Sequence, residues 1–157
     1  MLFPYHAARI KRAALIRLIL GRELLAQTLA GNEEAVASAL DVLHIHVTSN
    51  RSYNNEDALQ SAVCLAYIYA LNRYTVIREM TAGKGFADVV FIPFNDTDPA
   101  MIIEIKRNSC TESAITQIRD RRYFDSLSHY SGNLLFIGIN YDEKEKSHTC
   151  RIERLVK

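Results

Sequence analysis

Two acidic residues interrupt segments that are otherwise typical of buried strands. Asp88 lies in Ala-Asp-Val-Val-Phe-Ile, residues 87–92, and Glu104 lies in Ile-Ile-Glu-Ile-Lys, residues 102–106. A carboxylate among apolar neighbours is costly unless it is paired, hydrogen-bonded or bound to a metal. Because side chains alternate along a strand, Glu104 and Lys106 point to the same face. The pattern predicts that two carboxylates and a lysine gather at one site.

The chemistry of such a site follows from its residue types. A short connection joins the two strands, which favours an antiparallel pair that brings Asp88 and Glu104 together. Two converging carboxylates need a cation between them, and their hard oxygens select Mg²⁺ or Mn²⁺. A neighbouring lysine, Lys106, can then position water for attack on phosphorus. The alternative is a purely structural cluster, in which both acids pair with Lys84 and Lys106.

Positive charge is concentrated beside these carboxylates. Between residues 106 and 122, five basic residues accompany two acidic ones, although the whole chain has a net charge of only +1. On the helix expected there, Gln117, Arg121 and Phe124 share a face through their i, i+4, i+7 spacing. A phosphodiester substrate needs positive charge next to the metal. An ordinary solvated helix face has the same composition, so both interpretations stay open.

Hydrophobic periodicity predicts the elements that must position these residues. Their expected order is three helices, three strands, one helix and two strands, with the last strand at a sheet edge. The helices are expected at residues 7–30, 33–47, 56–72 and 111–127, and the strands at 74–80, 86–92, 100–106, 134–140 and 149–155. The helix ends are expected at Gly31-Asn32, at Asn54 or Asn55, and at Ser109 or Thr111.

Two of these helices have apolar patterns that predict burial. The first has a stripe formed by Ile10, Ala14, Leu18, Gly21 and Leu25, with its arginines on the solvent side. The third is apolar on nearly every face and is expected to lie between layers. The basic start of the first helix also resembles a transit peptide in composition, an alternative that ranks below an ordinary helix.

Composition limits the class of protein. The 157 residues are 48% hydrophobic and 24% charged, which excludes global disorder and fits one domain, or one domain with a small helical extension. No charge-free apolar stretch is long enough for a transmembrane helix, so no membrane partner is expected. Three cysteines at unrelated spacings predict neither a disulfide framework nor a zinc site and fit a reducing cytoplasm.

Several segments together resemble a known family. They include residues 53–56, 78–93, 103–108, 114–118 and 135–141, and they extend over most of the chain from about residue 30. This combination is similar to the PD-(D/E)xK nuclease superfamily, and more narrowly to the nuclease-type domain that follows an AAA-type ATPase domain in many bacterial proteins. The resemblance implies a restriction-endonuclease-like α/β core, with a mixed four- to five-stranded sheet flanked by helices. A helical extension is expected at residues 1–50 and the nuclease-like domain at 51–157.

The resemblance also implies roles for individual residues. The metal ligands would be Asp88, Glu104, the carbonyl of Ile105 and Glu56; the catalytic group would be Asp88, Glu104, Lys106 and Gln117; and nucleic acid would contact Lys84, Arg107 and Arg121. Ala87 replaces the family's proline, at a position that varies. Glu56 could equally favour the helix start through its charge alone. Glu79 could pair with Arg78 or Lys84, or lie beside the site.

The function expected is therefore hydrolysis of phosphodiester bonds, in DNA above all, by a nuclease that depends on Mg²⁺ or Mn²⁺. The alternative is a catalytically silent nucleic-acid-binding or regulatory module that acts with an ATPase partner. A third class is a structural assembly domain. The expected partners are nucleic acid, an AAA-type ATPase domain or protein, and a second copy in a homodimer.

Overall fold

Five strands form one mixed sheet, in chain order from one edge to the other. The computed structural model describes residues 4–47 and 55–156. The strands are β1 (Tyr74–Ala82), β2 (Gly85–Pro93), β3 (Ala100–Arg107), β4 (Leu134–Asp142) and β5 (Ser147–Leu155). Only the central pair, β3 and β4, is parallel. The five predicted strands, the antiparallel β2–β3 pair and the edge position of β5 are confirmed.

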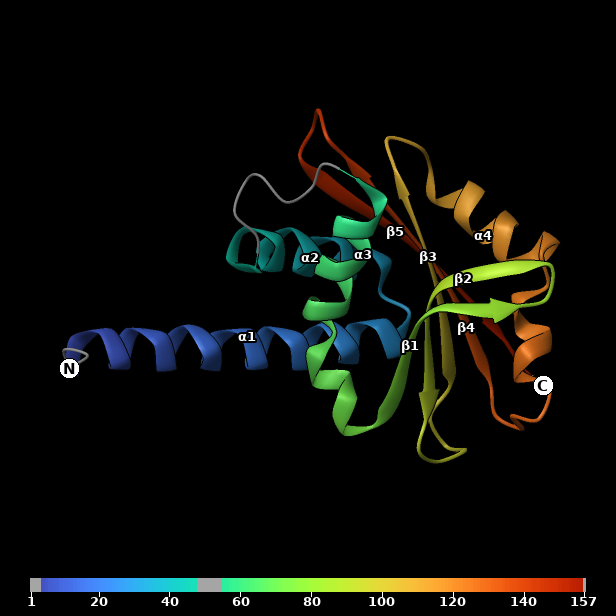
Figure 1. Ribbon diagram of the computed structural model, residues 1–157, viewed down its shortest axis with the longest axis horizontal. Coiled ribbons are helices and arrows are strands. Elements are labelled where there is room, and N and C mark those ends of the chain that lie inside the picture. Colours follow the sequence, from blue (N-terminus) through green and yellow to red (C-terminus); the bar gives the residue numbers. More distant parts are fainter. Residues whose placement is uncertain (1–3, 48–54, 157) are drawn as a thin grey trace.

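Helices cover both faces of the sheet (Figure 1). On one face lie α1 (Pro4–Ala30), α2 (Glu33–Val47) and α3 (Glu56–Ala66), and on the other lies α4 (Thr111–Asp120), which connects β3 to β4. A separate apolar core fills each interface, because successive side chains of a strand point to opposite faces. Ile103 and Ile105, for example, belong to the first core, and Ile102 belongs to the second. The predicted restriction-endonuclease-like α/β arrangement is confirmed.

The central strands separate where the acids lie. β2 and β3 pair over only three positions, from Phe91 opposite Met101 to Val89 opposite Ile103. Asp88 and Glu104 are the next residues beyond the last of these pairs. The two strands therefore form a fork, and the backbone groups just beyond it no longer bond across the ladder.

The helix predicted at residues 111–127 is shorter than expected. α4 ends at Asp120, Arg122 adopts a left-handed conformation with φ of 53°, and a 3-10 helix, Tyr123–Leu127, follows. The carbonyl of Arg121 accepts a hydrogen bond from the backbone N–H of Lys84 in the β1–β2 turn. In a continued helix, the Arg121 carbonyl would accept a hydrogen bond from a later turn of the same helix. The contact with Lys84 uses that carbonyl instead.

The helix predicted at residues 56–72 also ends early, at Ala66, and a 3-10 helix, Ile68–Asn72, follows it. The expected burial between layers holds for only part of α3. Leu59 and Val63 are buried in the core that α3 shares with the sheet, α1 and α2. Leu65 on α3, and Ile68 and Leu71 in the 3-10 helix, are exposed by 44–55%, so burial on nearly every face was wrong.

The predicted stripe of α1 is buried only in its second half. Gly21 and Leu25 pack against the core, whereas Ile10 and Leu18 are 60% and 49% exposed. Residues 8–19 are all exposed, because this part of the helix extends beyond the body (Figure 1). The expectation of a buried stripe was therefore wrong for the first half. No helix in the described ranges combines the length and apolar character needed to cross a membrane.

The helix ends agree with prediction at two places. Gly31, with φ of 75°, follows α1, and Asn55 caps α3 by accepting the N–H of Ala58. At α4 the prediction was wrong, because Cys110 is the N-cap and makes no side-chain capping bond. The alternative cap Asn54 and the proposed boundary at residues 50/51 lie outside the described residues, so the division into two parts stays a prediction.

Gly83 in the β1–β2 turn permits a close approach that anchors this hairpin. Its φ is 53°, and a Cβ there would lie 2.1 Å from the carbonyl oxygen of Arg121. We expect Gly83→Ala to lower the free energy of unfolding by about 2–4 kcal/mol, through left-handed strain and the clash together. Urea unfolding measures this change.

Gly31 provides the matched control for that substitution. Its φ is 75°, but a Cβ would meet nothing within 4 Å. Gly31→Ala is therefore expected to cost only the left-handed conformation, about 1–2 kcal/mol. Equal losses in the two variants would contradict the proposed steric contact.

Candidate active site

Asp88 lies in the fork between β2 and β3, and hydrogen bonds reach its carboxylate from two elements. Its Oδ2 accepts the backbone N–H of Ile105 at 2.8 Å, and its Oδ1 accepts the Nε2–H of Gln60 at 2.9 Å. The first bond satisfies an N–H on β3 beyond the paired part of the ladder. The second comes from α3, on the opposite side of the sheet from α4. The fork thus gives both helical layers access to one site.

Glu104 and Lys106 lie together on the α4 face, as their spacing predicted. Lys106 Nζ is 3.2 Å from Glu104 Oε1 and 2.6 Å from Gln117 Oε1. Gln117 in turn donates its Nε2–H to Glu104 Oε1. The three side chains form a closed hydrogen-bonded set in which Gln117 holds both the acid and the lysine.

Burial makes ionisation of Glu104 unfavourable. Its side chain is only 2% exposed, and desolvation together with the nearby charge of Asp88 raises its pKa to about 7, against the opposing effect of Lys106. Burial also raises the pKa of Asp88, while the Ile105 hydrogen bond and Lys106 oppose this. Two carboxylates whose pKa values rise for these reasons gain from a cation between them.

The oxygen atoms fit a divalent metal. Glu104 Oε2 is buried and has no hydrogen-bond partner among the described residues. Within residues 4–47 and 55–156, no three His, Cys, Asp or Glu side chains form a metal-binding group. Mg²⁺ commonly keeps several waters and takes only one or two carboxylates, so Asp88 and Glu104 would suffice to hold it, with the Ile105 carbonyl as the further ligand that the resemblance implies.

Two further acids lie near Asp88. The charges of Glu56, in the first turn of α3, and of Glu79 on β1 both raise the pKa of Asp88. Glu79 falls opposite Asp88 in the β1–β2 register, between the paired positions of Arg78 and Met80. Its φ of 50° is rare for a residue with a side chain. Of the alternatives for Glu79, the structure supports the position beside the site.

Three groups that support the site were missed from the sequence. Gln60 binds Asp88, Arg78 binds Gln60, and the buried Tyr123 accepts a hydrogen bond from Gln117 Nε2 at 3.1 Å. The spacing of Gln60 four residues after Glu56 could have indicated a shared helix face. Nothing local marks Arg78 or Tyr123, because tertiary packing alone brings them into position.

The three predicted nucleic-acid contacts occupy two places. Lys84 and Arg121 meet at the β1–β2 turn, where the Arg121 side chain lies across Gly85. Arg107, at the end of β3, forms an ion pair with Glu143 at 2.7 Å. The single helix face predicted for Gln117, Arg121 and Phe124 does not form, because α4 ends at Asp120, before Arg121 and Phe124.

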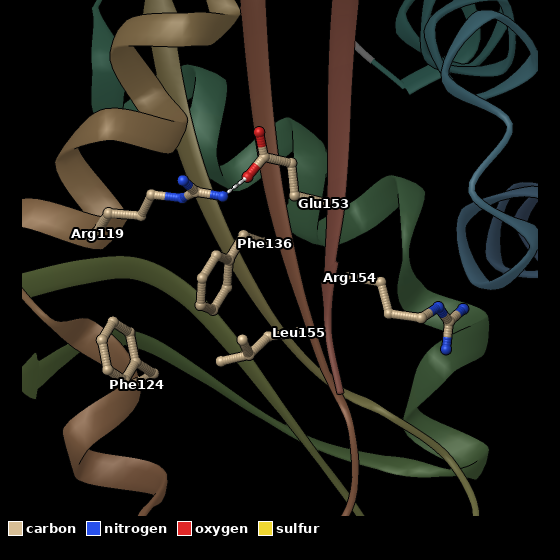
Figure 2. Close-up of a pocket in the computed structure, with 6 residues that line it drawn as sticks. All are labelled: Arg119, Phe124, Phe136, Glu153, Arg154 and Leu155. Carbon is tan, nitrogen blue, oxygen red and sulfur yellow. Dashed lines mark hydrogen bonds and ion pairs between the residues drawn. The ribbon is translucent and has the colours of Figure 1, made fainter. Parts of the chain in front are cut away.

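Phe124 instead lines a separate pocket of about 330 Å³ (Figure 2). It stacks on Phe136 with ring centroids 5.7 Å apart, and Arg119 at the rim is paired with Glu153. Figure 2 shows Arg154 directed away from the aromatic rings. None of the predicted catalytic residues lines this pocket, so it is distinct from the carboxylate site.

His148, which belonged to no predicted motif, is buried on the α2 side of the sheet. Its Nδ1 lies 2.7 Å from Asp41 Oδ1, and its ring is 5.7 Å from that of His44. Burial lowers the pKa of His148, and Asp41 opposes this effect. This cluster joins α2 to β5 and shares no residue with the carboxylate site.

The mixed sheet forks beside two carboxylates and a lysine, which is the arrangement that the sequence resemblance implies. A profile of the PD-(D/E)XK nuclease superfamily matches residues 54–150, more than half of the chain. The chain belongs to the PD-(D/E)XK nuclease superfamily, which confirms the resemblance in its motifs and places it among nucleases in general. Residues 53 and 54, part of the first of those motifs, lie outside the described structure.

Among solved structures, the chain is similar to a repair endonuclease from Pyrococcus abyssi, with 22% sequence identity and a TM-score of 0.38. The similarity covers 57% of this chain and 38% of that one, so the match extends over well under half of that endonuclease. No curated protein matches the chain.

Proposed function

We propose that this protein is a Mg²⁺- or Mn²⁺-dependent nuclease that hydrolyses phosphodiester bonds in DNA. The observation that carries the proposal is the buried Glu104 Oε2, which has no partner in the described structure and lies beside Asp88 and Lys106. A buried charged oxygen left unpaired is costly, and a divalent cation offsets that cost. Hydrogen bonds hold Asp88, Lys106 and Gln117 in place beside it.

Each residue has a distinct role in this proposal. Asp88, Glu104 and the Ile105 carbonyl hold the metal, with Glu56 nearby, and the metal supplies Lewis-acid polarisation of the phosphate and a more acidic water. Lys106 orients the attacking water and stabilises negative charge that develops on the phosphate. Gln117 keeps Lys106 and Glu104 in contact. Lys84, Arg107 and Arg121 bind the nucleic-acid backbone.

The proposed partners and location follow from the same reasoning. We retain an AAA-type ATPase domain or protein, a homodimer and a cytoplasmic location as proposals. The exposed apolar side chains of α1, including Leu15 and Ile19 at 58% and 59%, support a macromolecular partner. Their density over residues 8–19 exceeds what a solvated helix needs.

The direct test is incubation of the purified protein with Mg²⁺ and linear, circular, single-stranded and branched DNA, with RNA in parallel. We expect cleavage of DNA that chelation of the metal abolishes. Asp88→Asn is the matched control, because it keeps the shape of the side chain but removes the charge that binds metal. Cleavage of none of these substrates at saturating Mg²⁺ or Mn²⁺ would refute the proposed activity. Absence of Mg²⁺ binding in calorimetry would favour the silent binding module.

A further inference from the structure

Gln60 connects the metal-binding acid to a network outside the predicted catalytic group. This α3 residue is only 8% exposed, and its Nε2–H donates to Asp88 Oδ1 at 2.9 Å. The backbone N–H of Ile105 donates to Asp88 Oδ2 at 2.8 Å. The two donors approach from α3 and β3, so each oxygen of the carboxylate has one fixed partner.

Arg78 determines which way the Gln60 amide points. Arg78 Nη2 donates to Gln60 Oε1 at 3.2 Å and to Asp57 Oδ1 at 2.7 Å, and Nη1 donates to Ser61 Oγ at 3.2 Å. A guanidinium can only donate, so the Gln60 oxygen must face Arg78. The Gln60 amino group is then the one that faces Asp88. The arginine therefore presents a donor to the acid.

Asp88 needs such a donor because of the charges around it. Glu104, Glu56 and Glu79 all lie near enough to act on its carboxylate electrostatically. The terminal torsion of an aspartate is broad, so repulsion can turn the carboxylate away from the fork. A neutral donor held by Arg78 opposes that rotation and leaves the remaining lone pairs of both oxygens available.

We propose that Gln60, oriented by Arg78, is a positioning residue that holds Asp88 ready to bind the divalent metal. This role rests on the proposed function of the site, and it adds α3 and β1 to the elements that determine metal affinity. Residues that orient metal ligands typically change affinity by 10–100-fold when replaced. The role therefore predicts a change in metal affinity without a matching change in the chemical step.

Gln60→Met tests the role, because methionine has a similar length and volume but donates no hydrogen bond. We expect calorimetry to show Mg²⁺ binding weakened by about 10–100-fold. In cleavage assays the Mg²⁺ concentration for half-maximal rate should rise by a similar factor, while the rate at saturating Mg²⁺ stays near that of the wild type. A residue needed only for packing would not separate these two quantities.

Ser61→Ala is the matched control, since Ser61 also binds Arg78 but is not one of the two donors to the Asp88 carboxylate. Its Mg²⁺ affinity should equal that of the wild type. Arg78→Gln is the second variant, should Gln60→Met fold poorly; because Arg78 lies near the surface, it should show a smaller loss of affinity in the same direction.

The outcomes separate this role from the proposed function. Unchanged Mg²⁺ affinity in folded Gln60→Met, or in Arg78→Gln when that variant is needed, overturns the positioning role while the nuclease proposal stands. Equal losses of affinity in Ser61→Ala and Gln60→Met also overturn it. Absence of Mg²⁺ binding by the wild type overturns the proposed function and, with it, this role.

Discussion

Lys106→Met is expected to reduce cleavage by about 10³-fold while Mg²⁺ binding persists. Lys106 Nζ lies 3.2 Å from Glu104 Oε1 and 2.6 Å from Gln117 Oε1, so its positive charge lies directly beside a proposed metal ligand. Its loss removes the group that, in the proposed mechanism, orients water and stabilises charge on the phosphate. It removes no oxygen from the donor set, so the metal should bind at least as well.

The measurement pairs single-turnover cleavage with Mg²⁺ calorimetry on the same preparations. Lys11→Met is the matched control, because it makes the same chemical change on the exposed first half of α1. Full cleavage by Lys106→Met would remove the lysine from the mechanism. Loss of metal binding in this variant would instead show that Lys106 maintains the carboxylates in place.

Glu104→Gln is expected to have two large effects, a loss of metal binding and a gain in the stability of the metal-free protein. It should abolish measurable Mg²⁺ binding, because the buried carboxylate is a principal part of the donor set. It should also stabilise the metal-free protein at pH 8. Glutamine keeps the shape and can accept the hydrogen bonds from Lys106 and Gln117, but it avoids burial of a charge.

The sign of the stability effect follows from proton binding. The pKa of Glu104 is about 7 in the folded protein and 4.5 in its ordinary state, so the folded protein holds more protons between these values. The free energy of unfolding therefore falls as pH rises from about 4.5 to 7. Above pH 7 the full cost of ionised, buried Glu104 is present, and it amounts to roughly 2 kcal/mol or somewhat more.

Thermal unfolding in the presence of a chelator measures this effect. We expect Glu104→Gln to unfold about 5 °C above the wild type at pH 8, with a much smaller difference at pH 4.5. Glu145→Gln is the control, since Glu145 is exposed in the β4–β5 turn. A Glu104→Gln protein that is no more stable than the wild type at pH 8 would show that Glu104 carries no such cost.

The sheet could be predicted from the sequence because its signal is local. Each strand is either rich in β-branched and aromatic residues or alternates apolar with polar residues, and turn residues separate the strands. The proximity of the proposed site residues could be predicted for the same reason, since Asp88 and Glu104 conflict with their apolar neighbours. Direct succession of β2 and β3 along the chain then brought them together without knowledge of the remaining topology.

The helix ends were not predictable, because tertiary contacts determine them. The contact between Lys84 and Arg121 joins segments 37 residues apart, and no periodicity within residues 111–127 indicates the left-handed Arg122. The network of Gln60 and Arg78 depends in the same way on α3 packing beside β1. The first half of α1 shows the reverse problem, where an apolar stripe has no element of the described structure to cover it.

That exposed half of α1 has a geometric consequence. A continuous α-helix rises 1.5 Å per residue, so residues 8–19 form a stiff arm of roughly 18 Å outside the packed body. A molecule bound to the end of this arm would be held at a fixed distance from the sheet. The arm has the geometry of a spacer, and shortening it by whole turns would move an attached molecule closer without rotating it greatly.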